Sequence, residues 1–133
     1  MLVTEARGTM KANLRSGFLA LAILALAVPA HAGPFEDGLA AYEREEYATA
    51  LKFWRPLAEQ GDAIAQSNLG VMYEFGLGVP QDYVQAHMWF ELAAEQGSKK
   101  AQKNRDTAAS QMTPAQIAEA QRLAREWMEK HQR

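Results

Sequence analysis

The sequence predicts an all-α protein built as an α-solenoid, in which antiparallel helix pairs stack on one another. One stretch occurs twice, 36 residues apart, because Ala58-Glu59-Gln60-Gly61 returns as Ala94-Glu95-Gln96-Gly97. Apolar residues around both copies recur at steps of three and four, the period of one buried helix face. A repeat of about 34 to 40 residues in helix-forming sequence is typical of stacked helix pairs. We therefore expect about six helices, with a C-terminal helix capping the stack.

The first 32 residues have the order of charges and apolar residues that is typical of a secretory signal peptide. Lys11 and Arg15 precede an apolar run of 12 residues at 17–28, and Ala30-His31-Ala32 then matches a small-x-small cleavage site. The run reaches only about 18 Å as a helix, which is too short for a hydrocarbon core of about 30 Å. We expect cleavage after Ala32, a periplasmic or secreted product, and no stable membrane insertion after cleavage.

The remaining residues, 33–133, are acidic, with 11 Lys and Arg against 15 Asp and Glu and a net charge of −4. This balance argues against nucleic acid as a partner, because binding to a phosphate backbone needs clustered cations. The chain has no cysteine, so neither a disulfide nor a thiolate ligand is available. Helix packing must therefore stabilise the domain.

Residues 33–62 are expected to form a degenerate, tetratricopeptide-like helix pair, with helices at about 35–44 and 47–60. Pro56 lies inside the second helix, where proline removes a backbone hydrogen bond, so we expect a kink there or an earlier break. Gly61 supplies the left-handed residue that helix ends favour. The apolar face of the second helix consists of Tyr47, Ala50, Leu51, Trp54, Leu57 and Ala58.

Residues 63–98 are expected to form the best-defined unit, with helices at about 63–75 and 82–96. Asp62 and Asp82 are candidate N-caps for the two helices. Gly70 lets a neighbouring helix come close, because it has no side chain. The expected inward-facing residues are Ala65, Leu69, Met72, Tyr73, Tyr83, Ala86, Phe90, Ala93 and Ala94.

Residues 76–81 connect these two helices. Gly76 and Gly78 can adopt a positive φ, and Val79 can pack into the core. The loop has neither a preceding strand nor a following lysine, so it does not match a phosphate-binding loop. We expect it to be structural.

Residues 99–133 are expected to form a half repeat followed by the C-terminal capping helix. The first helix runs from about 98 to 110. The second begins with Thr113 as N-cap, Pro114 as its first residue and Gln116 as the capping-box partner. Its apolar stripe is Ile117, Ala120, Ala124 and Trp127.

The best-defined unit also carries a recognisable pattern: Ala65-Gln66-Ser67-Asn68-Leu69-Gly70-Val71-Met72-Tyr73, Gly76-Leu77-Gly78-Val79-Pro80-Gln81-Asp82-Tyr83, Ala86, Trp89, Phe90 and Ala93-Ala94-Glu95-Gln96-Gly97. This pattern resembles the Sel1-like repeat, a tetratricopeptide relative with a longer Gly-x-Gly-Val loop inside each helix pair. The resemblance implies a right-handed stack used as a protein-binding adaptor, often exported from bacterial cells. Some cysteine-rich relatives are associated with β-lactam binding, an activity that is not carried over to this cysteine-free chain.

No catalytic, cofactor-binding or metal-binding residue is expected. His87 has Glu91 four residues further on, but a metal or catalytic site needs a third group at a fixed distance. Glu43, Glu45 and Glu46 cluster at a helix end, where a solvated turn is the simpler interpretation. A small cell-envelope hydrolase, or an accessory protein of one, is the alternative from another functional class.

A protein or peptide is the expected partner, and the concave side of the solenoid is its expected site. The first helix of each pair lines that side. Side chains there that do not serve the core form an apolar patch beside a basic edge, to which Lys99 and Arg105 add. A solvated helix face is one alternative, and a structural module that associates weakly with itself is another. The candidate residues are Ile64, Ser67, Val71, Glu74, Lys100, Lys103 and Thr107.

Overall fold

The structure is a computed structural model that describes residues 32–132. The expected signal peptide lies outside the described residues, apart from Ala32 at its end. Within the described part, all regular secondary structure is helical, which confirms the all-α prediction. The six helices are α2 (Pro34–Glu43), α3 (Tyr47–Glu59), α4 (Ala63–Phe75), α5 (Tyr83–Glu95), α6 (Lys99–Ala109) and α7 (Pro114–His131).

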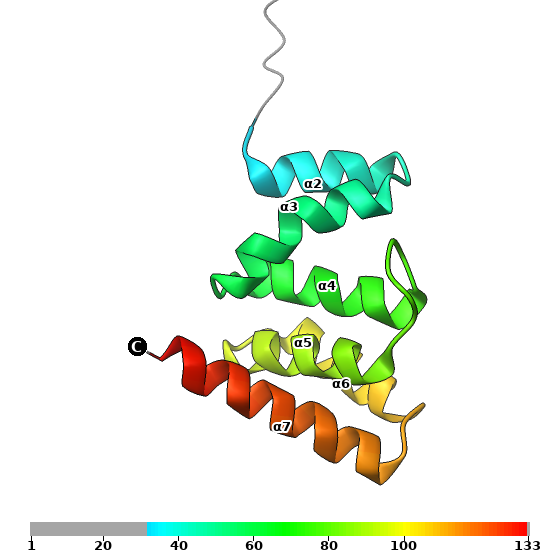
Figure 1. Cartoon of the computed structure of the whole chain (residues 1–133), viewed down its shortest axis with the longest axis vertical. Coiled ribbons are helices and arrows are strands. Elements are labelled where there is room, and N and C mark those ends of the chain that lie inside the picture. Colours follow the sequence, from blue (N-terminus) through cyan, green and yellow to red (C-terminus); the bar gives the residue numbers. More distant parts are fainter. Residues whose placement is uncertain (1–31, 133) are drawn as a thin grey trace, which may run out of the picture. The chain divides into compact units, whose positions relative to one another are not determined.

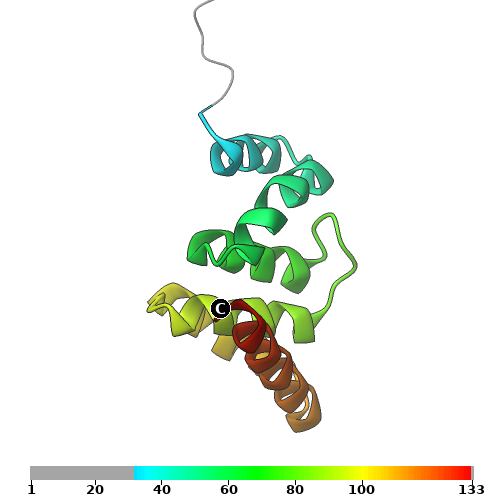
Figure 2. The ribbon, with the colours of Figure 1, turned by 60° about the vertical axis from the view of Figure 1, so that its left-hand side comes forward.

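Within the unit Gly33–Arg133, successive helices pack in a stack (Figure 1). Helix α2 packs on α3, α3 on α4, and α4 on α5. Helix α5 then contacts both α6 and α7, so the last two helices are held mainly by α5. Figure 2 shows the same order after rotation, with α7 lying across the end of the stack. The arrangement is the predicted solenoid of helix pairs with a C-terminal capping helix.

The core runs between the helices of the stack. Trp54 on α3, Leu69 and Met72 on α4, and Phe90 on α5 are the largest apolar side chains that are fully buried. A Cβ atom added at Gly70 would lie 2.4 Å from the Phe90 ring, so α4 and α5 approach closely only because residue 70 is glycine. This close approach confirms the expectation for Gly70.

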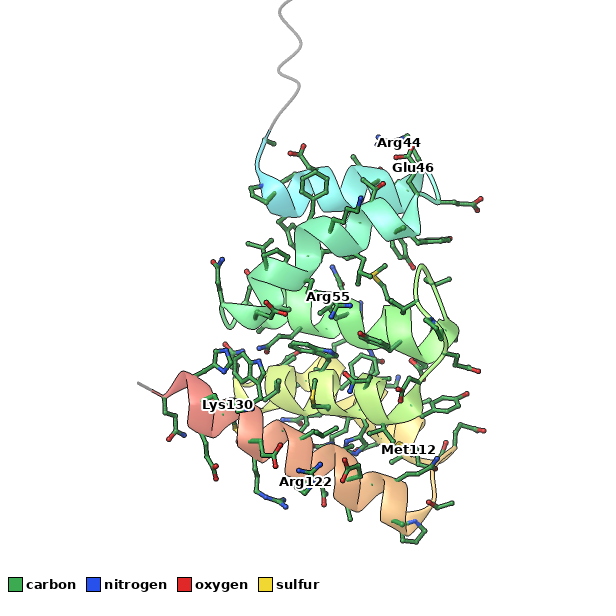
Figure 3. All side chains as sticks on the ribbon, in the orientation of Figure 1. Arg44, Glu46, Arg55, Met112, Arg122 and Lys130 are labelled. Carbon is green, nitrogen blue, oxygen red and sulfur yellow. The ribbon has the colours of Figure 1, made fainter. Side chains whose placement is uncertain are left out.

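Helix α3 continues through Pro56 and ends at Glu59, so the expected earlier break does not occur. The ribbon of α3 changes direction in its C-terminal half, as expected for a proline kink (Figure 1). Pro56 is exposed, which places the lost backbone hydrogen bond on the solvent side. The α3–α4 contact also contains Arg55, whose Nη2 donates to the Tyr73 hydroxyl at 3.0 Å (Figure 3).

The predicted caps fix the starts of the later helices. The Asp62 carboxylate accepts from the Ala65 backbone N–H at 2.8 Å, and that of Asp82 accepts from the Gln85 N–H at 3.0 Å. At α7, the Thr113 hydroxyl accepts from the Gln116 N–H, and the Gln116 side chain accepts from the Thr113 N–H, which completes the capping box.

The loop at residues 76–81 folds back against the preceding helix pair (Figure 1). Gly78 has a φ of 71°, and a Cβ added there would lie 2.8 Å from backbone atoms of Tyr47 and Ala48. Val79 packs against the main core, as expected. The loop therefore packs directly on the first helix pair, α2 and α3. None of the described helices is long and apolar enough to cross a membrane.

Candidate protein-binding surface

The first helices of the successive pairs contribute to one groove with a volume of about 210 Å³, which we call the α2/α4/α6 groove. Its apolar lining includes Leu39, which is 42% exposed, and the half-buried Val71. Lys100 on α6 provides a cation at its edge. The other lining residues are Tyr42, Trp54 and Asn68.

The candidate residues of α4 and α6 differ in how they meet this groove. Val71 and Lys100 line it, so the structure brings together one apolar and one basic candidate. Ile64, at the start of α4, is 63% exposed, and Ser67 is half-buried. Lys103 and Thr107 are exposed on α6 but do not line the groove.

Glu74 is buried, with 9% of its surface exposed, so it does not present an open carboxylate to a partner. The loop after α4 folds back over this helix end, where Gln81 Nε2 donates to the backbone oxygen of Glu74 at 2.7 Å. Burial raises the pKa of the Glu74 carboxyl, because removing a carboxylate from water disfavours its charged form. The helical period alone placed Glu74 on the open face.

Fewer cations are available at the basic edge than the sequence indicates. Arg105 forms ion pairs with Glu91 on α5 at 3.1 Å and with Asp106 at 3.2 Å. Lys99, Lys100 and Lys103 are exposed and have no ion pair within residues 32–132. Three lysines, and not four cations, are therefore available to an acidic partner.

Helix α2 also contributes to the groove, although none of its residues was among the candidates from the sequence. Leu39 and Tyr42 are apolar residues of the first helix, and the sequence alone does not distinguish core from groove positions between them. Tyr42 packs against Tyr47 and Trp54, and Leu39 lies at the rim beside them. The sequence signal that could have identified Leu39 is its position on the first helix of a pair, one turn before Tyr42.

His87 and the acidic residues were the groups whose chemistry the sequence raised. Residues 32–132 contain no group of three His, Asp or Glu side chains that could hold a metal ion. His87 is 3% exposed, and its Nδ1 has no hydrogen-bond partner. Burial lowers the pKa of His87, and the neighbouring Glu91 only partly opposes this effect. His87 is therefore a packed side chain that favours its neutral form.

Stacked helix pairs with a groove along their first helices define an α-solenoid of the interaction type. The family model for the Sel1 repeat matches residues 33–62 and 63–98. The chain therefore belongs to the Sel1-like repeat family, and the resemblance seen in the sequence is confirmed.

Similar proteins support this assignment. A Sel1-like repeat-containing protein of Acanthamoeba polyphaga mimivirus is 45% identical over 35% of this chain and 9% of its own length. An F-box protein of Arabidopsis thaliana is 39% identical over 50% of this chain and 18% of its own length. A Sel1-like repeat-containing protein of Schizosaccharomyces pombe is 41% identical over 37% of this chain and 7% of its own length.

A solved structure shows the same fold. The crystal structure of a protective antigen present in uropathogenic Escherichia coli strains, displaying an SLR fold, matches with a TM-score of 0.69 and 33% identity. The match covers 74% of this chain and 22% of the antigen chain. The chain thus spans less than a quarter of the length of each of these relatives.

Proposed function

We propose that this chain is an exported, non-catalytic adaptor that binds a protein or peptide partner in the α2/α4/α6 groove. The observation that carries the proposal is the groove itself, in which the exposed Leu39 and the half-buried Val71 lie beside Lys100, a lysine that has no ion pair within residues 32–132. Repeat solenoids use such extended surfaces for recognition. Protein–protein interaction is also the general role of Sel1-like repeats.

The chemistry of the groove favours a partner segment with both apolar and acidic residues. Leu39 in the groove, and Ile64 outside it at the start of α4, expose apolar surface that a partner can cover, which is the main source of affinity in most interfaces. The three exposed lysines of α6 add attraction to carboxylates, an effect that weakens as salt screens the charges. A single groove of this size supports affinity in the micromolar range or so.

The proposed export rests on residues 1–32, whose charged, apolar and small-x-small order matches a signal peptide. Mass spectrometry of the protein recovered from a bacterial periplasm should find Gly33 at the N-terminus. An intact chain recovered from the cytoplasm, or one retained in the membrane with residues 17–28, would contradict export.

Partner capture followed by charge reversal tests the groove. Proteins retained from a periplasmic extract are identified, and their affinity is then measured for the wild type and for Lys100→Glu/Lys103→Glu. Each exposed pair contributes about 0.2–1 kcal/mol and reversal adds repulsion, so affinity should fall about tenfold. The control is Lys52→Glu, an exposed charge change on α3 outside the groove. If the control variant loses binding while the α6 double variant keeps it, the groove is not the site.

A further inference from the structure

A second cavity, of about 320 Å³, lies where the C-terminal ends of α3 and α5 meet the last turns of α7. We call it the helix-end cavity. Figure 1 shows the ends of these three helices on the same side of the stack. Its volume is at the lower end of the range of about 300–1,000 Å³ for ligand pockets, which suits one side chain better than a folded element.

The 36-residue repeat gives this cavity two equivalent carboxylates. Glu59 and Glu95 occupy the same position in the two Ala-Glu-Gln-Gly turns, and both line the cavity. Both are exposed, and neither has an ion pair or hydrogen bond among the described residues. Each is the last residue of its helix, where the backbone carbonyls add a partial negative charge.

A buried amide chain orients a further acceptor toward this region. Gln66 is fully buried, and its Nε2 donates to the backbone oxygen of Ala58 at 3.1 Å. Its Oε1 in turn accepts from Gln96 Nε2 at 2.8 Å. Gln96 lines the cavity, and within residues 32–132 no hydrogen bond reaches its Oε1, so this oxygen can accept one from a ligand.

Helix α7 closes the cavity with an aromatic wall. The Trp127 and His131 rings are stacked, with centroids 3.8 Å apart and an interplanar angle of 10°. His131 Nδ1 donates to the Trp127 backbone oxygen at 2.7 Å, so in the neutral imidazole Nε2 is an acceptor. Leu92 adds a buried apolar surface. The cavity thus combines negative charge and several acceptors with an apolar, aromatic side.

We propose that the helix-end cavity binds an arginine side chain of a partner protein. A guanidinium group is always charged, and its five N–H donors can reach several acceptors at once. Its planar face packs against aromatic rings, and its three-carbon stem covers apolar surface such as that of the half-buried Met128, which also lines the cavity. A lysine ammonium offers a point charge without this planar face, so arginine matches the cavity better. The proposal does not rest on the α2/α4/α6 groove.

The test uses the ¹⁵N-labelled protein and the blocked tripeptide acetyl-Gly-Arg-Gly-amide, followed by NMR. The Trp127 indole N–H and the Gln96 side-chain amide should shift and saturate, with a dissociation constant in the millimolar range or so for such a small ligand. The same peptide with citrulline keeps the shape but loses the charge, and it should bind about tenfold more weakly. A Trp127 signal that does not move, or equal affinity for the citrulline peptide, would overturn the proposal.

Matched variants locate the charge that is recognised. Glu59→Gln/Glu95→Gln should weaken arginine binding about tenfold or more, with each single variant giving part of the loss. Glu129→Gln, an exposed change on α7 outside the cavity, is the control and should bind as the wild type does. Normal binding by a double variant with an unchanged melting temperature would overturn the proposal. Sedimentation velocity tests whether the cavity binds a second copy of the chain. If the wild type self-associates and the double variant does not, the occupant is a second copy, and the proposed partner is wrong.

Discussion

Replacing Gly78 with alanine tests whether the loop at residues 76–81 connects the two helix pairs. Gly78 combines two demands that alanine cannot meet together. Its φ of 71° lies in the left-handed region, and an added Cβ would lie 2.8 Å from the backbone of Tyr47 and Ala48. Those backbone atoms belong to the first turn of α3 and cannot rotate away as a side chain can.

The expected cost follows from three contributions. Left-handed backbone costs a residue with a Cβ about 1–2 kcal/mol, and overpacking against a fixed neighbour costs about 1–3 kcal/mol. The reduced freedom of the unfolded chain returns about 0.4–1 kcal/mol. Gly78→Ala should therefore lower the free energy of unfolding by about 1–5 kcal/mol, with a middle value of about 3 kcal/mol, a large part of the stability of a domain of this size.

Gly97→Ala is the matched control, because Gly97 has a φ of 96° but no atom within 4 Å of an added Cβ. It should cost about 1 kcal/mol from backbone strain alone. Urea unfolding followed by tryptophan fluorescence gives both values, provided that the slopes agree. If Gly78→Ala costs no more than Gly97→Ala, the loop does not pack on α3, and the reasoning from this contact is refuted.

Three further outcomes are expected. Leu69→Ala should lower the free energy of unfolding by about 2–5 kcal/mol in urea titrations, because Leu69 is fully buried. An unchanged urea midpoint would contradict the buried position of Leu69 on α4. His87 has a lowered pKa when folded, so the unfolded chain binds more protons and stability should fall as pH drops below about 6.5. The urea midpoint should therefore be lower at pH 5.5 than at pH 7.5. His87→Leu, which copies Leu51 at the equivalent repeat position, should make the two midpoints more similar. If they differ as much as in the wild type, His87 is not the source of the pH dependence. Thr113→Ala should cost about 1 kcal/mol by removing the α7 cap, whereas the same change at exposed Thr107 within α6 should cost less in the same titration.

Features set by neighbours in the sequence were predicted from it. The caps at Asp62 and Thr113 depend on groups within three residues, so the residue types alone indicate where the helices begin. The closeness of α4 and α5 also followed from one residue, because a glycine inside an apolar helical stripe indicates a close approach. The repeat period then indicated how these elements stack.

Features set by contacts between distant residues were not predicted. Glu74 is on the open face by helical period, but its side chain is buried, and Gln81 from the following loop donates to its backbone oxygen. The sequence of α6 alone suggests that Arg105 is available to a partner, but Glu91 on α5 forms an ion pair with it. The helix-end cavity forms only because α7 packs on α5. Periodicity predicts the apolar stripe of α7, but it does not predict which helix that stripe packs against.

The capping role of α7 bears on how far the stack can extend. Arg122, on its outer face, forms ion pairs with Glu119 and Glu126, and all three side chains are about half exposed (Figure 3). A second copy stacked on this face would remove these charges from water, and the cost of desolvating ion pairs often exceeds their attraction. End-to-end growth through α7 is therefore disfavoured. The two proposed partner sites, the groove of α2, α4 and α6 and the cavity at the ends of α3, α5 and α7, both lie away from this face.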